Sequence, residues 1–199
     1  SAPTAAAAKV WPQIQSWAIS SGIPLDILGT WIKRESNYNP KDYNPEKGAM
    51  LSWSGEIAAG KAKWGKNPDY QNAVAVNARL KAGESVSSVA KDWKFGSYGL
   101  MQVSRIGAAG RGGYGYTARN SGLFNVNTNL KVGTTFINSL KNQIYGDEAM
   151  NDNKWATVRA AYVGGPGILK QRPGRAADIA GQFLGTLKQV RAQMTKGNA

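Results

Sequence analysis

The sequence predicts a mainly α-helical protein. Apolar residues recur at helical spacing in several stretches, no stretch alternates apolar and polar residues for more than a few positions, and Gly or Pro separates the stretches. The chain has 199 residues, of which 42% are hydrophobic, so it can bury a substantial core. We expect a single domain over residues 1–199, and we find no internal repeat or low-complexity linker.

Two helices are predicted before Pro40. Residues 5–20 carry apolar side chains at helical spacing, and Pro12 marks either a kink or a late start. Gly22 breaks the pattern, and Pro24 suits the first position of the next helix. This second helix must end before Pro40, because proline disfavours helical backbone in the residue that precedes it.

Glu35 stands on the apolar face of the second predicted helix. Ile27, Leu28 and Trp31 precede it at spacings that place all four residues on one side. Glu35 is also the only carboxylate in that stretch after Asp26. A carboxyl on an apolar face loses hydration of its charged form, so we expect the pKa of Glu35 to be raised, as a general acid at neutral pH requires.

The middle of the chain is less regular. Residues 43–64 are rich in Gly, Ser and Trp, and we expect a loop there with a short helix near 56–63. Two modest helices are predicted over residues 69–80 and 85–93. Residues 107–116 contain five glycines and no hydrophobic period, which predicts a mobile loop or lid.

The last third has a clearer pattern. Amphipathic helices are predicted around residues 130–144, 155–162 and 179–194. The run Gly164-Gly165-Pro166-Gly167 separates the last two of them.

Composition restricts the chemistry. The chain contains no cysteine and no histidine, which excludes disulfides, Ser-His-Asp and Cys-His catalysis, and the usual zinc sites. Acid/base chemistry near neutral pH must therefore use a carboxylate, lysine or tyrosine with a shifted pKa. We expect neither a metal nor an organic cofactor.

The net charge of +13, from 25 basic and 12 acidic residues, favours a polyanionic partner such as nucleic acid, an anionic membrane or a cell wall. The chain lacks a helix-turn-helix signature, an RNP-like aromatic strand and a zinc pattern, so we expect no nucleic-acid partner. No apolar run approaches the roughly 20 residues that span a bilayer, so we expect no membrane insertion. A solvated basic surface without a specific ligand stays open as an alternative.

Three short stretches carry most of the functional signal. They are Glu35-Ser36-Asn37-Tyr38-Asn39-Pro40, Gly96-Ser97-Tyr98-Gly99-Leu100-Met101-Gln102-Val103 and Ala160-Ala161-Tyr162-Val163-Gly164-Gly165-Pro166-Gly167. In this order they resemble the lytic transglycosylase and goose-type lysozyme superfamily, which has a catalytic Glu opening an E-S-x-aromatic-N-P stretch, a G-L-M-Q turn and an A-Y-N-A-G-P-G element. The resemblance covers roughly residues 23–168.

The resemblance implies a lysozyme-like α fold with the sugar chain in a cleft. It also implies cleavage of the bond between N-acetylmuramic acid and N-acetylglucosamine in bacterial peptidoglycan, with Glu35 as general acid and then as base. The 6-hydroxyl of muramic acid would close a 1,6-anhydro ring, and we prefer this non-hydrolytic outcome. A hydrolytic muramidase stays open, with Asp42, Glu46 or Glu56 as the second carboxylate. A more distant alternative is a non-catalytic basic protein that binds the cell wall or nucleic acid.

The substrate-binding residues that we expect are Ser97, Tyr98, Met101, Gln102, Tyr162, Tyr114 and Tyr116. The glycines around Ser97 and Tyr98 let the backbone approach a ligand, and the Gln102 amide can meet a hydroxyl or acetamido group. The Tyr162 hydroxyl can bond the carboxyl or the sugar. The rings of Tyr114 and Tyr116 are candidates for stacking on sugars.

Two departures from the family pattern stand out. Glu35 and Gly99 lie 64 positions apart, so residues 41–93 are predicted to be an inserted subregion. Val163 replaces the Asn that follows the family's tyrosine. We expect an extracytoplasmic enzyme that acts on the cell wall as a monomer, and both a phage-encoded or virion-associated setting and a bacterial one stay open.

Overall fold

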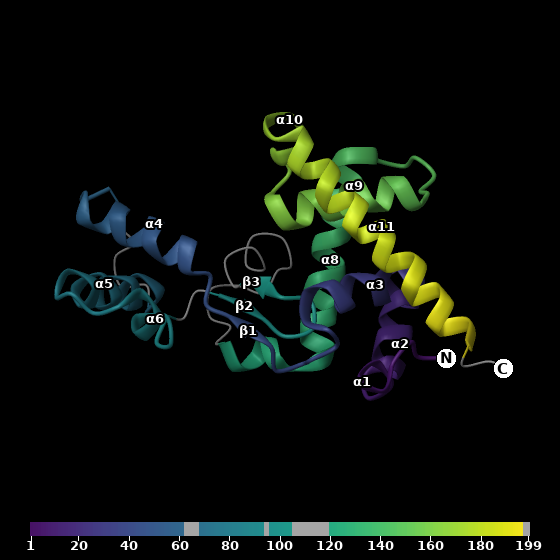
Figure 1. The fold of residues 1–199 in the computed structure, drawn as a ribbon, viewed down its shortest axis with the longest axis horizontal. Helices are drawn as coiled ribbons and strands as arrows, with labels where there is room; N and C mark the ends of the chain where they lie inside the picture. Colours follow the sequence, from purple (N-terminus) through teal and green to yellow (C-terminus); the bar gives the residue numbers. More distant parts are fainter. Residues whose placement is uncertain (62–67, 94–95, 105–119, 197–199) are drawn as a thin grey trace.

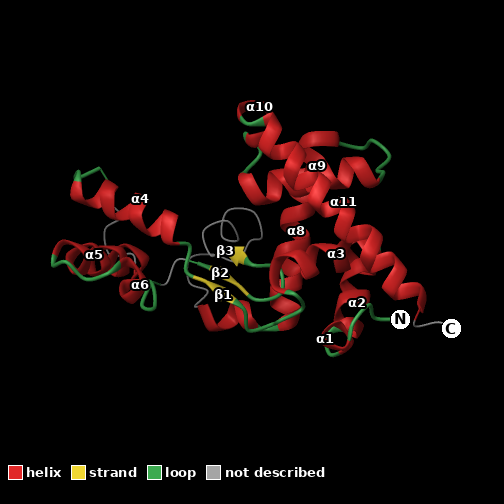
Figure 2. Ribbon diagram, in the orientation of Figure 1, coloured by secondary structure: helices red, strands yellow, loops and turns green. Residues whose placement is uncertain are grey.

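The computed structural model describes residues 1–61, 68–93, 96–104 and 120–196. These residues are mainly helical, as predicted, with one small three-stranded sheet (Figures 1 and 2). The helices are α1 (Ala5–Ala8), α2 (Trp11–Ser21), α3 (Leu25–Ser36), α4 (Lys47–Ala58), α5 (Pro68–Lys81), α6 (Val86–Val89), α8 (Val126–Tyr145), α9 (Asp152–Gly164), α10 (Ile168–Gln171), α11 (Pro173–Lys196) and the 3-10 helix η1 (Asn120–Phe124).

The sheet is antiparallel, in the order β1 (Tyr43–Asn44), β2 (Ser97–Tyr98), β3 (Val103–Ser104). Tyr43 pairs with Tyr98, although 55 positions separate the two residues. The sheet thus joins the segment that follows the Glu35 motif to the G-L-M-Q turn across the predicted insertion.

The main core lies among α2, α3, α8, α9 and α11, and α11 crosses both α9 and α3 (Figure 1). Trp31 and Leu28 of α3 are completely buried there, together with Leu130 of α8, Val158 of α9 and Phe183 of α11. Burying each such side chain stabilises the fold by about 1.5–3 kcal/mol. Helix α3 therefore has a fixed position within the bundle.

Helix α3 has a defined beginning and end. Asp26 lies in its first turn, where a negative charge favours the helix dipole. Asn37 ends the helix in the left-handed conformation, with φ of 50°, and its N–H bonds the carbonyl of Lys33. Asparagine tolerates this conformation better than most residues do. The end of α3 therefore falls just after Glu35, as the sequence predicts.

Helices α4, α5 and α6 form a separate lobe, which Figure 1 shows on the left of the molecule. The lobe has a small core of its own, formed by Met50, Ala73, Val76, Val89, Ala90 and Trp93. This lobe falls inside the predicted insertion 41–93, but whether those residues are an insertion relative to other family members stays a prediction.

The loop that we expected over residues 43–64 is wrong for Lys47–Ala58, which form α4. The short helix expected near 56–63 overlaps only the last turn of α4, and residues 62–64 lie outside the described part of the chain. Gly48, Ser52 and Gly55 make this segment a poor helix former. Packing against the small core stabilises the helix nevertheless, since Met50 is completely buried.

Two further helices differ in length from their predictions. The helix expected over residues 85–93 ends at Val89, and hydrogen bonds between residues three apart continue the turn to Trp93. The helix expected over residues 5–20 is divided into α1 and α2, and Pro12 lies in the first turn of α2, so the late start was the right alternative. Among the residues that the structure describes, no helix is both long and apolar enough to cross a membrane.

Candidate active site

Glu35 lies in the last turn of α3, at the edge of the main core. Trp31, one turn earlier on the same face, is completely buried, and the Glu35 side chain keeps only 15% of its surface exposed. The carboxyl therefore occupies the largely dry position that the apolar spacing of α3 predicts.

Helix α9 places Arg159 against this carboxyl. Nη1 of Arg159 donates a hydrogen bond to Oε1 of Glu35 at 2.5 Å, and the arginine side chain is 7% exposed. Its guanidinium carbon lies 5.5 Å from the ring centre of Trp31 and 5.7 Å from that of Tyr162. Arg159 was not predicted from the sequence, because nothing local to α9 signals a partner 124 positions away.

Tyr162 joins α9 to the G-L-M-Q turn. Its hydroxyl donates a hydrogen bond to the carbonyl of Met101 at 2.5 Å, and its ring meets Trp31 edge-on at 5.3 Å. Arg159 and Tyr162 are three positions apart, so they share one face of α9, just as Trp31 and Glu35 share one face of α3. We call the side chains of Trp31, Glu35, Arg159 and Tyr162 the acid box. Two of the predicted site residues, Glu35 and Tyr162, belong to it.

Two opposing effects act on the Glu35 carboxyl. Burial, which is the larger, raises its pKa above 4.5, while the charge and hydrogen bond of Arg159 lower it. Glu46 adds a smaller raising effect and Arg34 a smaller lowering one, and the net direction is upward. Burial also raises the pKa of Tyr162 well above 10, with the Glu35 charge adding to it, so this hydroxyl remains a hydrogen-bond donor.

The G-L-M-Q turn is held by buried polar groups. The Asn129 side chain donates to the carbonyls of Tyr98 and Leu123 at 2.6 and 2.8 Å, and it accepts from the Met101 N–H at 2.9 Å. Ser36 Oγ donates to the Leu100 carbonyl at 2.7 Å. The residue after the candidate acid is therefore bonded directly to the turn, and the sequence analysis missed this role of Ser36 as well as that of Asn129.

Gly99 allows this turn to form. Its φ of +72° is strained for any residue with a side chain, and a Cβ there would lie 2.5 Å from Asn129 Nδ2. The N–H of Gly99 also bonds the carbonyl of Asp42 at 2.7 Å, which ties the turn to the segment before β1.

The other described residues with predicted substrate roles have structural partners. Ser97 Oγ donates to Glu46 Oε1 at 2.8 Å, and the Gln102 amide donates to the carbonyls of Asp42 and Gly99 at 3.2 and 3.0 Å. Tyr98 is 2% exposed and packs against the rings of Tyr43 and Phe124, and Met101 is completely buried. The substrate roles of these residues stay predictions, and Tyr114, Tyr116 and the predicted lid over 107–116 lie outside the described residues.

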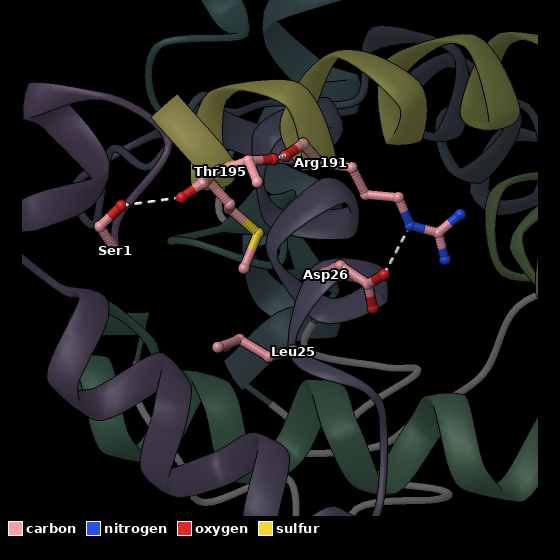
Figure 3. A pocket seen from close by; sticks show the side chains of 6 residues that line it. Ser1, Leu25, Asp26, Arg191 and Thr195 are labelled. Carbon is pink, nitrogen blue, oxygen red and sulfur yellow. Dashed lines mark hydrogen bonds and ion pairs between the residues drawn. The ribbon is translucent and has the colours of Figure 1, made fainter. Parts of the chain in front are cut away.

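The pockets that the described residues form include two larger ones away from the acid box. One, of about 560 Å³, opens between the lobe and the sheet and includes Tyr43, Trp93, Tyr98 and Phe124 in its lining. The other, of about 410 Å³, lies at the far end of α3, where Asp26 and Arg191 already bond each other (Figure 3). Asp26 precedes Glu35 by nine residues, or roughly 13 Å of helix, so the second pocket is no part of the acid box.

The acid box contains no set of side chains suited to a metal ion, and nowhere in the described part of the chain do three or more His, Cys, Asp or Glu residues gather as metal ligands would. A mainly helical domain with a shielded carboxyl at the junction of two helices and a tight turn is typical of the lysozyme-like enzymes. The family model for the transglycosylase SLT domain matches residues 12–182, so this chain belongs to the SLT transglycosylase family and with it to the peptidoglycan-cleaving transglycosylases. Neither a curated protein nor a solved structure matches the chain.

Proposed function

We propose that this protein is a lytic transglycosylase that cleaves the β-1,4 bond between N-acetylmuramic acid and N-acetylglucosamine, with Glu35 as the only acid/base group. The observation that carries the proposal is the largely buried position of the Glu35 carboxyl at the end of α3, where the next residue, Ser36, bonds the G-L-M-Q turn. Its raised pKa favours the protonated form that a general acid needs.

Two proton transfers complete the proposed reaction. Protonated Glu35 gives its proton to the glycosidic oxygen, the bond from C1 of muramic acid to that oxygen breaks, and the N-acetyl oxygen of the same sugar bonds to C1. The Glu35 carboxylate then takes the proton of the C6 hydroxyl, whose oxygen bonds to C1 as the N-acetyl oxygen leaves. The product is a 1,6-anhydro end, Glu35 is protonated again, and no water is consumed.

The test is Glu35→Gln, assayed on purified sacculi. Glutamine cannot donate a proton as an acid, so we expect lysis, measured as loss of turbidity, to fall by about 10³-fold or more. The introduced amide oxygen can still accept a hydrogen bond from Arg159, so circular dichroism and sedimentation with sacculi should match the parent protein. Lysis at the parental rate would overturn the proposal.

A hydrolytic muramidase is the second candidate, and Glu46 favours it. This residue is partly buried, adopts an unusual φ of +51°, bonds Ser97 Oγ, and its charge acts on Glu35. A second carboxylate facing the acid could activate a water molecule. By contrast, Glu56 is exposed on α4.

Mass spectrometry of the digested sacculi separates the two reactions. We expect 1,6-anhydromuramic acid ends from both the parent protein and Glu46→Gln. Reducing-end muramic acid from the parent, lost in Glu46→Gln but kept in Glu56→Gln, would instead establish hydrolysis with Glu46 as the base.

The proposed substrate places the site of action outside the cytoplasm, on the cell wall, and the net charge of +13 suits an anionic wall. We propose that the protein acts as a monomer on glycan strands, in either a phage or a bacterial setting. Analytical ultracentrifugation tests the monomer directly.

A further inference from the structure

We propose that Arg159 is the positioning residue of the acid/base step: it fixes the direction of the Glu35 carboxyl and stabilises the carboxylate that remains once the proton has left. The kinetic part of this inference rests on the proposed function, whereas the pairing itself can be tested in the free protein. No motif that the sequence offers includes this arginine.

The geometry gives Arg159 little freedom. Its guanidinium is held between the Glu35 carboxyl, at 2.5 Å, and the rings of Trp31 and Tyr162. Tyr162 is fixed in turn by its hydrogen bond to Met101. The Arg159 side chain is 7% exposed and the Glu35 side chain 15% exposed, so the surrounding residues restrict the rotation of both. The guanidinium can therefore fix the orientation of one carboxyl oxygen of Glu35.

The electrostatics explain why a buried acid needs this partner. Without a counter-charge, the carboxylate left by proton donation would be an unpaired charge in a largely buried position, which is strongly unfavourable. Such a carboxyl would hold its proton too firmly to give it to a weakly basic glycosidic oxygen. Arg159 offsets part of the burial effect, so both protonation states become accessible during one reaction cycle.

Besides burial, three charged groups act on the titration of Glu35. Arg159 acts from α9, Arg34 lies beside it on α3, and Glu46 acts from the segment before α4. Tyr162 also faces the carboxyl from α9, and the Glu35 charge raises its pKa. Of the two arginines, Arg159 is buried and donates a hydrogen bond to the carboxyl, whereas Arg34 is exposed and bonds Gln182. Arg34→Met is therefore a matched control, which removes a nearby positive charge without removing the pair.

The first measurement is a ¹³C NMR titration of glutamate carboxyl groups in the free protein. The chain has five glutamates, and Glu35→Gln assigns the Glu35 signal by its loss. In Arg159→Met the Glu35 midpoint should move to higher pH than in the parent, whereas Arg34→Met should leave it nearly unchanged. An unchanged midpoint in Arg159→Met, or equal shifts in both variants, would overturn the pairing, whether or not the protein cleaves peptidoglycan.

The second measurement is the pH–rate profile on soluble glycan strands. Arg159→Met should lower kcat by about 10²-fold with little change in KM, and its alkaline limb should move to higher pH. Arg159→Lys keeps the charge but loses the planar fork, so its limb should stay near the parental pH while kcat still falls. If Arg159 had only a structural role, its substitution would lower the amount of folded enzyme without shifting the alkaline limb of the pH–rate profile.

Circular dichroism checks that each variant folds. Should Arg159→Met fail to fold, Arg159→Lys carries the test, and a parental kcat in that variant would refute the positioning role. A parent protein that leaves sacculi intact would instead refute the proposed function, and the NMR result would still decide the pairing.

Discussion

At the scale of single residues, Glu35 of α3 and Arg159 of α9 form a largely buried ion pair between two helices. The apolar face of α3 indicated Glu35 because Trp31 lies one turn before it on the same side. Arg159 belongs to a helix 124 positions away, so its place depends on how α9 packs in the folded molecule. Spacing within one helix is readable from the sequence, whereas a pair between two helices is not.

The raised pKa of Glu35 predicts how activity depends on pH. Only the protonated carboxyl can donate, so the lysis rate should fall as pH rises through the folded-state pKa, which burial holds above 4.5. A turbidity assay over a pH series at constant ionic strength measures this limb. A rate that does not fall until the protein unfolds at alkaline pH would contradict the assignment.

The Glu35 carboxyl should lower the free energy of unfolding as pH rises, whereas most acidic groups in folded proteins raise it. Between pH 4.5 and the raised folded value, the folded protein binds more protons at Glu35 than the unfolded chain does. The free energy of unfolding should therefore lose this contribution as pH rises through that window. We expect the Tm of the parent, measured relative to that of Glu35→Gln, to fall as pH rises, and a relative Tm that rises would contradict the pKa direction.

At the scale of elements, the helices with a clear apolar face were predicted and those stabilised by tertiary packing were not. Helices α5, α8, α9 and α11 lie where the apolar period indicates them. Most of α4 was not predicted, and the short helix expected near 56–63 reached only its last turn. The glycines and serines of α4 weaken the apolar spacing of Met50, Trp53 and Ile57, which belong to the core of the lobe. Each strand has only two residues, too few to show alternation of apolar and polar side chains, so the sheet could not be predicted from the sequence either.

The G-L-M-Q turn gives a prediction with a matched control. Gly99→Ala should lower the free energy of unfolding by about 3 kcal/mol, because a Cβ at this φ is strained and would also meet Asn129. Gly22 ends α2 with the same φ of +72° and open space around it, so Gly22→Ala should cost only about 1 kcal/mol. Urea unfolding measures both, and equal losses would show that the contact with Asn129 is unimportant.

At the scale of the whole molecule, one arginine joins three helices. Arg191 of α11 donates to Asp26 in the first turn of α3 at 2.7 Å, and to both oxygens of Asp152 at the start of α9 at 2.7 and 2.9 Å (Figure 3 shows the Asp26 bond). Its hydrogen bonds lower the pKa of Asp152 below 3.8. The two helices that carry the acid box are thus held at their beginnings by the same side chain.

Arg191→Met should destabilise the protein by about 1 kcal/mol, a small value because the Arg191 side chain is 44% exposed and solvent screens the pairs. The part of the contribution that comes from Asp152 requires the ionised carboxylate, so the difference from the parent should shrink as pH falls through the lowered pKa of that residue. Thermal unfolding measures the difference. Arg175→Met, a change at an exposed arginine on the same helix, is the control and should have little effect.

The separate core of the α4–α6 lobe means that the molecule can open in part. Six buried side chains stabilise the lobe, and paired strands of two residues join it to the rest, so its backbone amides should exchange their hydrogens at a lower free energy than those of α3 or α8. In such a partly open form, Glu35 and Arg159 would stay paired in the main core. The pairing of β1 with β2 beside the lobe would be weakened. A glycan strand, the proposed substrate, could then approach the acid from the side of the sheet.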